Sequence, residues 1–270
     1  MNETGKARIA VLITGQLRDY RINALNHMKH LIEPNGADVF IYACTKNTIH
    51  TLGRGNQLNQ KYILTNEYAI EEIENSVRQI YGNHLKDLRI DSNESLPEHN
   101  FGTLGYFRQR MQNQIDNIGK GFDLALEYSL RKDFEYDIFV RCRPDNSMFP
   151  KKINLLNFQC QDGTIYSTKF SSGHRDLCFF AFGNKRSFEE YCSYTYMQDA
   201  DPNSTANPPS TEHRWEDYLS SIGVKTKYII DVCKPFTGFD KTQPVTDFPF
   251  RNREELLIDP NGGFVRQGEP

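Results

Sequence analysis

The chain has 270 residues, 38% of them hydrophobic, and its 18 Phe and 14 Tyr supply more aromatic side chains than a disordered protein carries. A formal net charge of -3 excludes a global basic field for nucleic acid or an acidic membrane, so any polyanionic ligand needs a local cluster of Arg and Lys. No apolar run approaches the roughly 20 residues of a membrane-spanning helix, and the first residues lack a signal-peptide pattern, which favours a cytoplasmic location.

The first 43 residues have the pattern of a β-α-β unit. A continuous apolar run over 8–14 predicts a strand buried on both faces, and apolar residues at helical spacing predict a helix over 19–32. A Pro-Asn-Gly sequence at 34–36 predicts a break, and 37–43 predicts a second strand. Strand, helix and strand in this order form a parallel pair with a right-handed crossover.

The middle of the chain contains the longest helical pattern. Residues 45–65 are polar and predict a mobile loop, followed by a helix over 67–80 and a short strand over 85–90. Apolar positions three and four apart predict a long helix over 104–130, which two internal glycines would kink or divide.

A strand over 136–140 leads directly into an Arg-rich motif. Further elements are predicted as strands over 164–166, 177–182 and 225–232, and as helices over 184–197 and 212–222. After residue 233 the composition changes to Pro, Gly, Phe and charge without periodicity. The pattern predicts an α/β domain over 1–233, with a mostly parallel central sheet flanked by helices, and a C-terminal arm over 234–270 packed on or over it.

The Arg-rich motif is Arg141-Cys142-Arg143-Pro144-Asp145, at the end of a predicted strand. Alternate residues of a strand point the same way, so Arg141 and Arg143 are expected to converge on one anionic group. A carboxylate beside two cations stays ionised, which lets Asp145 hold a divalent ion. The motif therefore predicts a grip on a metal-diphosphate, and the alternative is a salt-bridge cluster that ends a strand.

The turn after the first strand is a second candidate for nucleotide binding. It contains Thr14, Gly15, Gln16 and Arg18, and it precedes a predicted helix whose first N–H groups favour anions. Gly15 lets the backbone approach a ligand, and Arg18 adds a charged donor. The sequence is neither G-x-G-x-x-G nor a P-loop. An ordinary turn with a surface arginine remains the alternative.

Two carboxylates are candidates for the acceptor side. Asp176 stands before the apolar strand 177–182, and Glu212 stands at the start of a predicted helix near Trp215, the single tryptophan. A carboxylate at the start of a buried strand, or beside an aromatic side chain, is suited to act as the general base for a sugar hydroxyl. The alternatives are that Asp176 caps a turn and that Glu212 serves the helix dipole.

Together these motifs resemble GT-A-like glycosyltransferases of bacterial surface-polysaccharide loci and large viruses. The resemblance covers roughly residues 8–230 and rests on these matches: Gly15-Gln16-Leu17-Arg18, a Gln- and aromatic-containing helix near 106–114, Tyr136-Asp137 with Arg141 to Asp145, Asp176 to Phe182-Gly183, and Glu212 with Ile222-Gly223. By that likeness Asp145 stands where GT-A enzymes place a carboxylate of their Asp-x-Asp metal site. This chain departs from the site in having Arg143 where the first Asp would be.

The resemblance implies a GT-A-like catalytic domain with a Rossmann-like nucleotide-binding half. It implies transfer of a sugar from a nucleotide-diphosphate sugar to a glycan acceptor, by an inverting or a retaining route, with Mn or Mg on Asp145 as a possible cofactor. Glu212 is expected as the base ahead of Asp176. Two other functions stay open: transfer of a sugar phosphate, and non-catalytic binding of a nucleotide or glycan.

Overall fold

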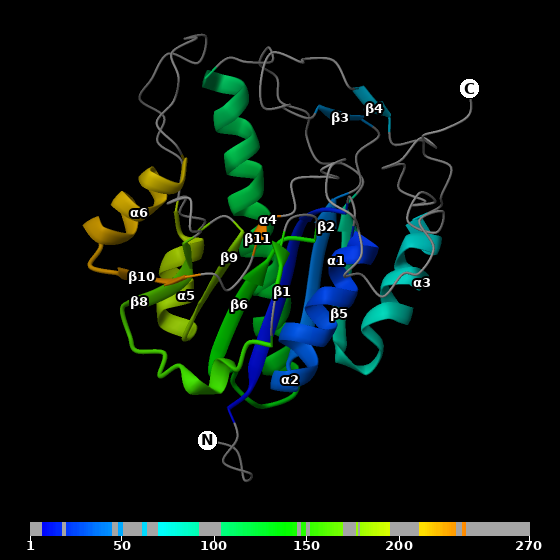
Figure 1. The fold of residues 1–270 in the computed structure, drawn as a ribbon, viewed down its shortest axis with the longest axis horizontal. Helices are drawn as coiled ribbons and strands as arrows, with labels where there is room; N and C mark the ends of the chain where they lie inside the picture. The colour runs from blue at the N-terminus through cyan, green and yellow to red at the C-terminus, as the bar shows by residue number, and fades with distance from the viewer. Residues whose placement is uncertain are drawn as a thin grey trace.

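The computed structural model describes residues 7–17, 20–44, 48–50, 61–63, 70–91, 104–144, 147–149, 152–169, 177, 179–194, 211–230 and 234–235. Within them a seven-stranded sheet forms the centre, in the order β10-β8-β9-β6-β1-β2-β5 (Figure 1). The strands are β1 (Ile9–Gln16), β2 (Asp38–Cys44), β5 (Leu85–Asp91), β6 (Ile138–Cys142), β8 (Thr164–Lys169), β9 (Phe180–Gly183) and β10 (Lys225–Ile230).

Most of the sheet is parallel, as predicted. Strand β1 pairs in parallel with β2 and β6, β2 pairs in parallel with β5, and β8 pairs in parallel with β10. Strand β9 runs antiparallel to both of its neighbours, β6 and β8. All the other strands of the sheet therefore end at the same edge, which we call the carboxyl edge; the opposite side is the amino edge.

Helices cover both faces of the sheet, which explains the continuous apolar runs in its central strands. One face packs against α1 (Tyr20–His27) and α3 (Ile70–Tyr81), and the other packs against α4 (Leu104–Arg131), α5 (Lys185–Cys192) and α6 (Thr211–Ser221). No helix in the described ranges is both long enough and apolar enough to cross a bilayer.

The first predicted helix continues further than its sequence break indicates. After α1 come a π-helical turn, η1 (Met28–Ile32), and a short helix, α2 (Glu33–Asn35). Pro34 lies in the first turn of α2, where a missing N–H removes no helical bond. The helix ends at Gly36, which has a φ of 57° and caps the last turn in the left-handed conformation.

Helix α4 is one undivided helix, although its two glycines predicted a kink or a division. Gly121 instead allows a close approach to the sheet, because a Cβ at this position would lie 2.5 Å from Thr14 Cγ2. A Cβ at Gly119, by contrast, would meet no atom of another part of the described structure within 4 Å. The glycine at 121 is thus explained by helix-to-strand packing.

Other predicted elements differ mainly at their ends. The strand predicted over 136–140 is observed over 138–142, and the strand predicted over 177–182 begins only at Phe180. Helix α5 ends at Cys192 instead of reaching 197. Within the predicted loop 45–65, β3 (Thr48–His50) and β4 (Lys61–Ile63) pair antiparallel, and the rest of that loop lies outside the described residues.

The remaining short elements are two helical turns and two short strands. They are the 3₁₀ turns η2 (Gly82–His84) and η3 (Leu155–Asn157), and the strands β7 (Ser147–Met148) and β11 (Lys234–Pro235). Strand β11 pairs antiparallel with β7, so the described start of the C-terminal arm lies beside the segment that follows the Arg-rich motif.

Candidate functional site

The strand order places a topological switch point between β1 and β6. From β1 the chain proceeds to β2 and β5 on one side, and then returns to β6 on the other side of β1. In open α/β sheets, ligands bind outside the carboxyl ends of the strands at such a point. Any ligand site of this kind is therefore expected above the last residues of β1 and β6.

Two motifs singled out in the sequence meet at this point. Ile13 and Cys142 are partners in the register of β1 and β6, and a Cβ on Gly15 would lie 3.6 Å from Pro144 Cδ. Gly15 has a φ of 128°, a backbone conformation that side chains other than glycine rarely adopt. Residues 14–16, predicted as a turn, instead form the last residues of β1, and the structure brings this end of β1 together with the Arg-rich motif.

Arg143 lies at the carboxyl edge, half-buried. Its guanidinium carbon is 5.0 Å from the centre of the Phe179 ring, which immediately precedes β9. Because β9 is antiparallel, its first residues reach the edge where β6 ends, and Phe180 is the partner of Cys142. A cation over an aromatic face is held in orientation without losing its charge, so Arg143 suits binding of an anion at this edge.

Arg141 lies inside the protein, with 0% of its surface exposed. Its register partners are Leu12 on β1 and Ala181 on β9, which both belong to the core beneath α4 and α5. Burial, followed by Asp123 and Glu189, raises the pKa of the nearby Cys192 thiol, and the positive charge of Arg141 acts in the opposite direction. Arg141 and Arg143 therefore have different environments, although the sequence predicted one shared role.

The other predicted nucleotide-binding residues are less exposed than their role requires, have side chains that are not described, or lie outside the described residues. Thr14 is fully buried beneath α4, and its Oγ1 has no hydrogen-bond partner among the described residues. Gln16 is the last residue of β1, and its side chain is not described. Arg18 and Asp145 lie outside the described residues. Of the predicted nucleotide-binding residues, Gly15 and Gln16 at the end of β1 and Arg143 after β6 are therefore described at the edge.

For the two predicted acceptor carboxylates, the structure describes neighbouring residues but not the carboxylates themselves. Asp176 lies outside the described residues, and the carbonyl of the adjacent Leu177 accepts a 2.6 Å hydrogen bond from Tyr191 Oη. Glu212 belongs to the first turn of α6, and its side chain is not described. The last residues of α6 lead to Lys225, whose N–H donates to the Gly163 carbonyl at the amino edge. The first turn of α6 therefore points toward the carboxyl edge (Figure 1).

Trp215 is a core residue rather than the wall of an open site. Its ring stacks on Tyr191 and Tyr194, with centroid distances of 4.5 and 5.5 Å, and its Nε1 donates to the Tyr191 carbonyl at 3.2 Å. The side chain is fully buried. Its role is to anchor α6 on α5, which fixes where the first turn of α6 begins.

A polar cluster at the ends of β2 and β5 was not predicted. Tyr42 Oη donates a 3.1 Å hydrogen bond to Asp91 Oδ2, and Lys120 Nζ lies 5.0 Å from the centre of the Tyr42 ring. The hydrogen bond with Tyr42 raises the pKa of Lys120, which keeps this amine charged. These residues come from three distant parts of the chain, and the one sequence signal was that Asp91 follows a predicted strand.

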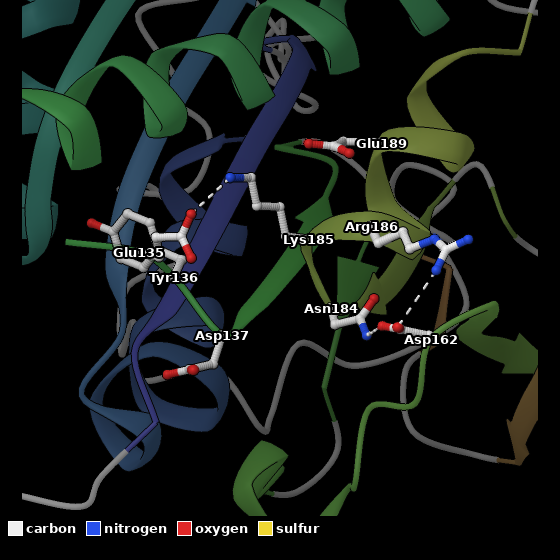
Figure 2. A pocket seen from close by; sticks show the side chains of 8 residues that line it. All are labelled: Glu135, Tyr136, Asp137, Asp162, Asn184, Lys185, Arg186 and Glu189. Atoms are coloured by element: carbon white, nitrogen blue, oxygen red, sulfur yellow. Dashed lines mark hydrogen bonds and ion pairs between the residues drawn. The ribbon is translucent and has the colours of Figure 1, made fainter. Parts of the chain in front are cut away.

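A pocket of about 470 Å³ lies at the opposite, amino edge (Figure 2). It lies between the start of β6 and the start of α5, and charged side chains of both signs line it. Lys185 pairs with Glu135 at 3.0 Å, and Arg186 pairs with Asp162 at 3.7 Å. Both basic side chains are paired and acidic side chains outnumber them in the lining, so the pocket presents no positive cluster for a polyanionic ligand.

The described residues do not supply a metal site. Among them, no group of three His, Cys, Asp or Glu side chains stands close enough together to hold an ion. Asp145, the predicted metal ligand, lies outside the described residues. Arg143 is described at the switch point, and its charge would itself neutralise part of a diphosphate.

Comparison with known proteins leaves the site to be judged by its geometry. No family model matches this chain, and no curated protein matches it.

Proposed function

We propose that the chain transfers a sugar from a nucleotide-diphosphate sugar to a glycan acceptor at the carboxyl edge. The observation that carries the proposal is that Gly15, near the end of β1, lies close to Pro144, beside Arg143, at the switch point of the sheet. A close backbone approach on one side and a guanidinium on the other are the groups that a diphosphate requires.

The strand order supports the GT-A part of the proposal. Numbered in chain order, the seven strands of the sheet lie in the order 3-2-1-4-6-5-7, read from β5 to β10, with the sixth reversed. The half 3-2-1-4 is shared with dinucleotide-binding sheets, whose continuation is 5-6. A reversed strand inserted after the fourth is similar to the arrangement of GT-A glycosyltransferases, and it brings Phe179 to the edge beside Arg143.

An inverting route requires two groups on opposite sides of the sugar, and the retaining route stays open. The bond between the anomeric carbon and the diphosphate oxygen breaks, and negative charge develops on the departing nucleoside diphosphate. Arg143 stabilises that charge. The acceptor hydroxyl forms the new bond to the anomeric carbon and gives its proton to a base, a role we assign to Glu212 ahead of Asp176. A divalent ion on Asp145 would add charge to the leaving group, but no step here depends on it.

The test is a panel of UDP-, GDP- and dTDP-sugars, read first by thermal shift and then by hydrolysis and product mass. A ligand at 100 times its Kd adds about 2.7 kcal/mol to the free energy of unfolding. Stabilisation together with release of the nucleoside diphosphate supports the proposal. Release of the nucleoside monophosphate instead identifies a sugar-phosphate transferase, and stabilisation without any turnover identifies a binding module. A chain that no member of the panel stabilises is not a nucleotide-sugar enzyme of these three classes.

A further inference from the structure

The segment that follows the Arg-rich motif is held by asparagine side chains from one helical run. Asn26 on α1 makes two hydrogen bonds with the backbone of Phe149: its Nδ2 donates to the carbonyl at 3.0 Å, and its Oδ1 accepts from the N–H at 2.6 Å. Asn35 on α2 holds the other end, where it donates to the Ile153 carbonyl at 2.7 Å and accepts from the Leu155 N–H at 2.8 Å.

The π-helical turn η1 explains how both asparagines reach the same segment. Positions 26 and 35 of an unbroken α-helix lie about two and a half turns apart and would point to opposite sides. The wider turn over Met28–Ile32 changes this phase, and the His30 carbonyl within it accepts a 2.9 Å bond from the Ile153 N–H. Helix α1, η1 and α2 therefore form one support that binds the backbone of Phe149, Ile153 and Leu155.

Two connections lead from Asn26 to Arg143. The first is along the chain, because only four residues separate Pro144, which lies close to Gly15, from Phe149, whose backbone is hydrogen-bonded by Asn26. The second is through aromatic contacts. The Phe149 ring packs edge-on against Phe180 at 5.3 Å, and the neighbouring Phe179 lies beneath the Arg143 guanidinium.

We infer that Asn26 is a positioning residue for the anion-binding Arg143, although it lies on a helix and offers nothing to the ligand itself. The inference rests on the proposed function, since it assigns Arg143 to the donor diphosphate. Asn26 holds the backbone of Phe149. Through the contact between Phe149 and Phe180, it keeps the neighbouring Phe179 beside the end of β6, where Arg143 lies. If the Asn26 hydrogen bonds are lost, the Arg143 guanidinium keeps its charge but points in a different direction. Small displacements of a binding group weaken binding and slow turnover.

The test compares Asn26→Asp with Asn35→Asp. Each variant keeps an acceptor oxygen and replaces the donating amide with a second oxygen that faces a backbone carbonyl. Asn26→Asp loses one donated bond, and Asn35→Asp loses two, because Asn35 also donates to the Leu31 carbonyl at 2.6 Å. The binding probe is whichever of UDP, GDP and dTDP binds the wild-type protein best, measured by calorimetry below the unfolding temperature. We expect Asn26→Asp to weaken binding roughly tenfold, and Asn35→Asp to lower the Tm while leaving the Kd close to wild type.

A double-mutant cycle separates positioning from general destabilisation. If Asn26 acts through Arg143, Asn26→Asp weakens binding in the wild-type background but has almost no further effect in an Arg143→Ala background. Additive losses overturn the inference, as does a wild-type Kd for Asn26→Asp. If Asn26→Asp does not fold, Phe149→Leu takes its place, because it keeps both backbone bonds of Asn26 and removes the ring contact with Phe180.

Failure of the proposed function gives a different result. If none of the three nucleotides binds the wild-type protein, the proposed function and the role assigned to Arg143 both fall. The hold itself is then read by hydrogen exchange of the peptide that contains residues 141–149. Exchange about tenfold faster in Asn26→Asp than in Asn35→Asp shows that Asn26 fixes the motif, and equal exchange overturns that part as well.

Discussion

At the scale of single residues, the two arginines of the motif are expected to behave differently. Arg143→Ala removes a partly exposed guanidinium from the carboxyl edge, so we expect a loss of about 2 kcal/mol in donor binding, which is roughly thirtyfold in Kd, with little change in Tm. Arg186→Ala is the control, because Arg186 is an exposed arginine at the amino edge. Equal affinities for wild type and Arg143→Ala, measured by calorimetry with the nucleoside diphosphate, contradict the assignment.

Arg141 is expected to affect the free energy of unfolding rather than ligand contact. The side chain is fully buried between the sheet and the helices that cover it, and Arg141→Met leaves the groups around it without the guanidinium. Removing one partner of a buried charged interaction costs about 3–5 kcal/mol, and Arg141 has interactions in this interior. Urea denaturation of the two proteins measures this difference. A midpoint for Arg141→Met equal to that of the wild type shows that the buried charge is dispensable.

At the scale of elements, the packing of α4 on β1 makes opposite predictions for two neighbouring glycines. In Gly119→Ala the added Cβ meets no atom of another described segment, so the better helix propensity of alanine stabilises the protein by up to about 1 kcal/mol. Gly121→Ala places a Cβ against Thr14 Cγ2, and overpacking of this kind costs about 1–3 kcal/mol. Thermal denaturation of both variants checks the signs. Thr14→Ser removes the methyl group in question, and it should restore most of the stability of Gly121→Ala.

The elements themselves were largely predictable from the sequence, and their special contacts were not. The apolar runs of β1 and β2 and the spacing in α4 identify them because burial on both faces, or on one stripe, leaves a local pattern. No local pattern shows that Gly121 faces Thr14, that Trp215 lies between two tyrosines, or that Asn26 binds Phe149. Those contacts join residues far apart in the chain, so they depend on the tertiary packing.

The candidate site was predictable in the same limited sense. A glycine after one strand and an Arg-Pro pair after another indicate an edge, because parallel strands end together. The sequence did not predict the different burial of Arg141 and Arg143, since the two residues have the same charge and their spacing predicts that they point to the same face of the strand. Nor did the reversed direction of β9, which brings Phe179 under Arg143. A strand's direction in a sheet is set by its connections and leaves no mark on its own residues.

At the scale of the whole molecule, the direction of the strands divides the surface into two edges with different expected roles. The carboxyl edge holds the Gly15 and Arg143 turns, whereas the amino edge holds the charge-paired pocket of Figure 2. A bound nucleoside diphosphate should therefore slow hydrogen exchange in peptides that contain residues 13–17 and 141–144, because it covers the backbone of both turns. Peptides that contain residues 135–138 and 184–186 are the internal control, and they should exchange at the same rate with and without the nucleotide. Protection at the amino edge alone would place the ligand in the pocket and contradict the proposed site, since strand direction is what assigns the ligand to the other edge.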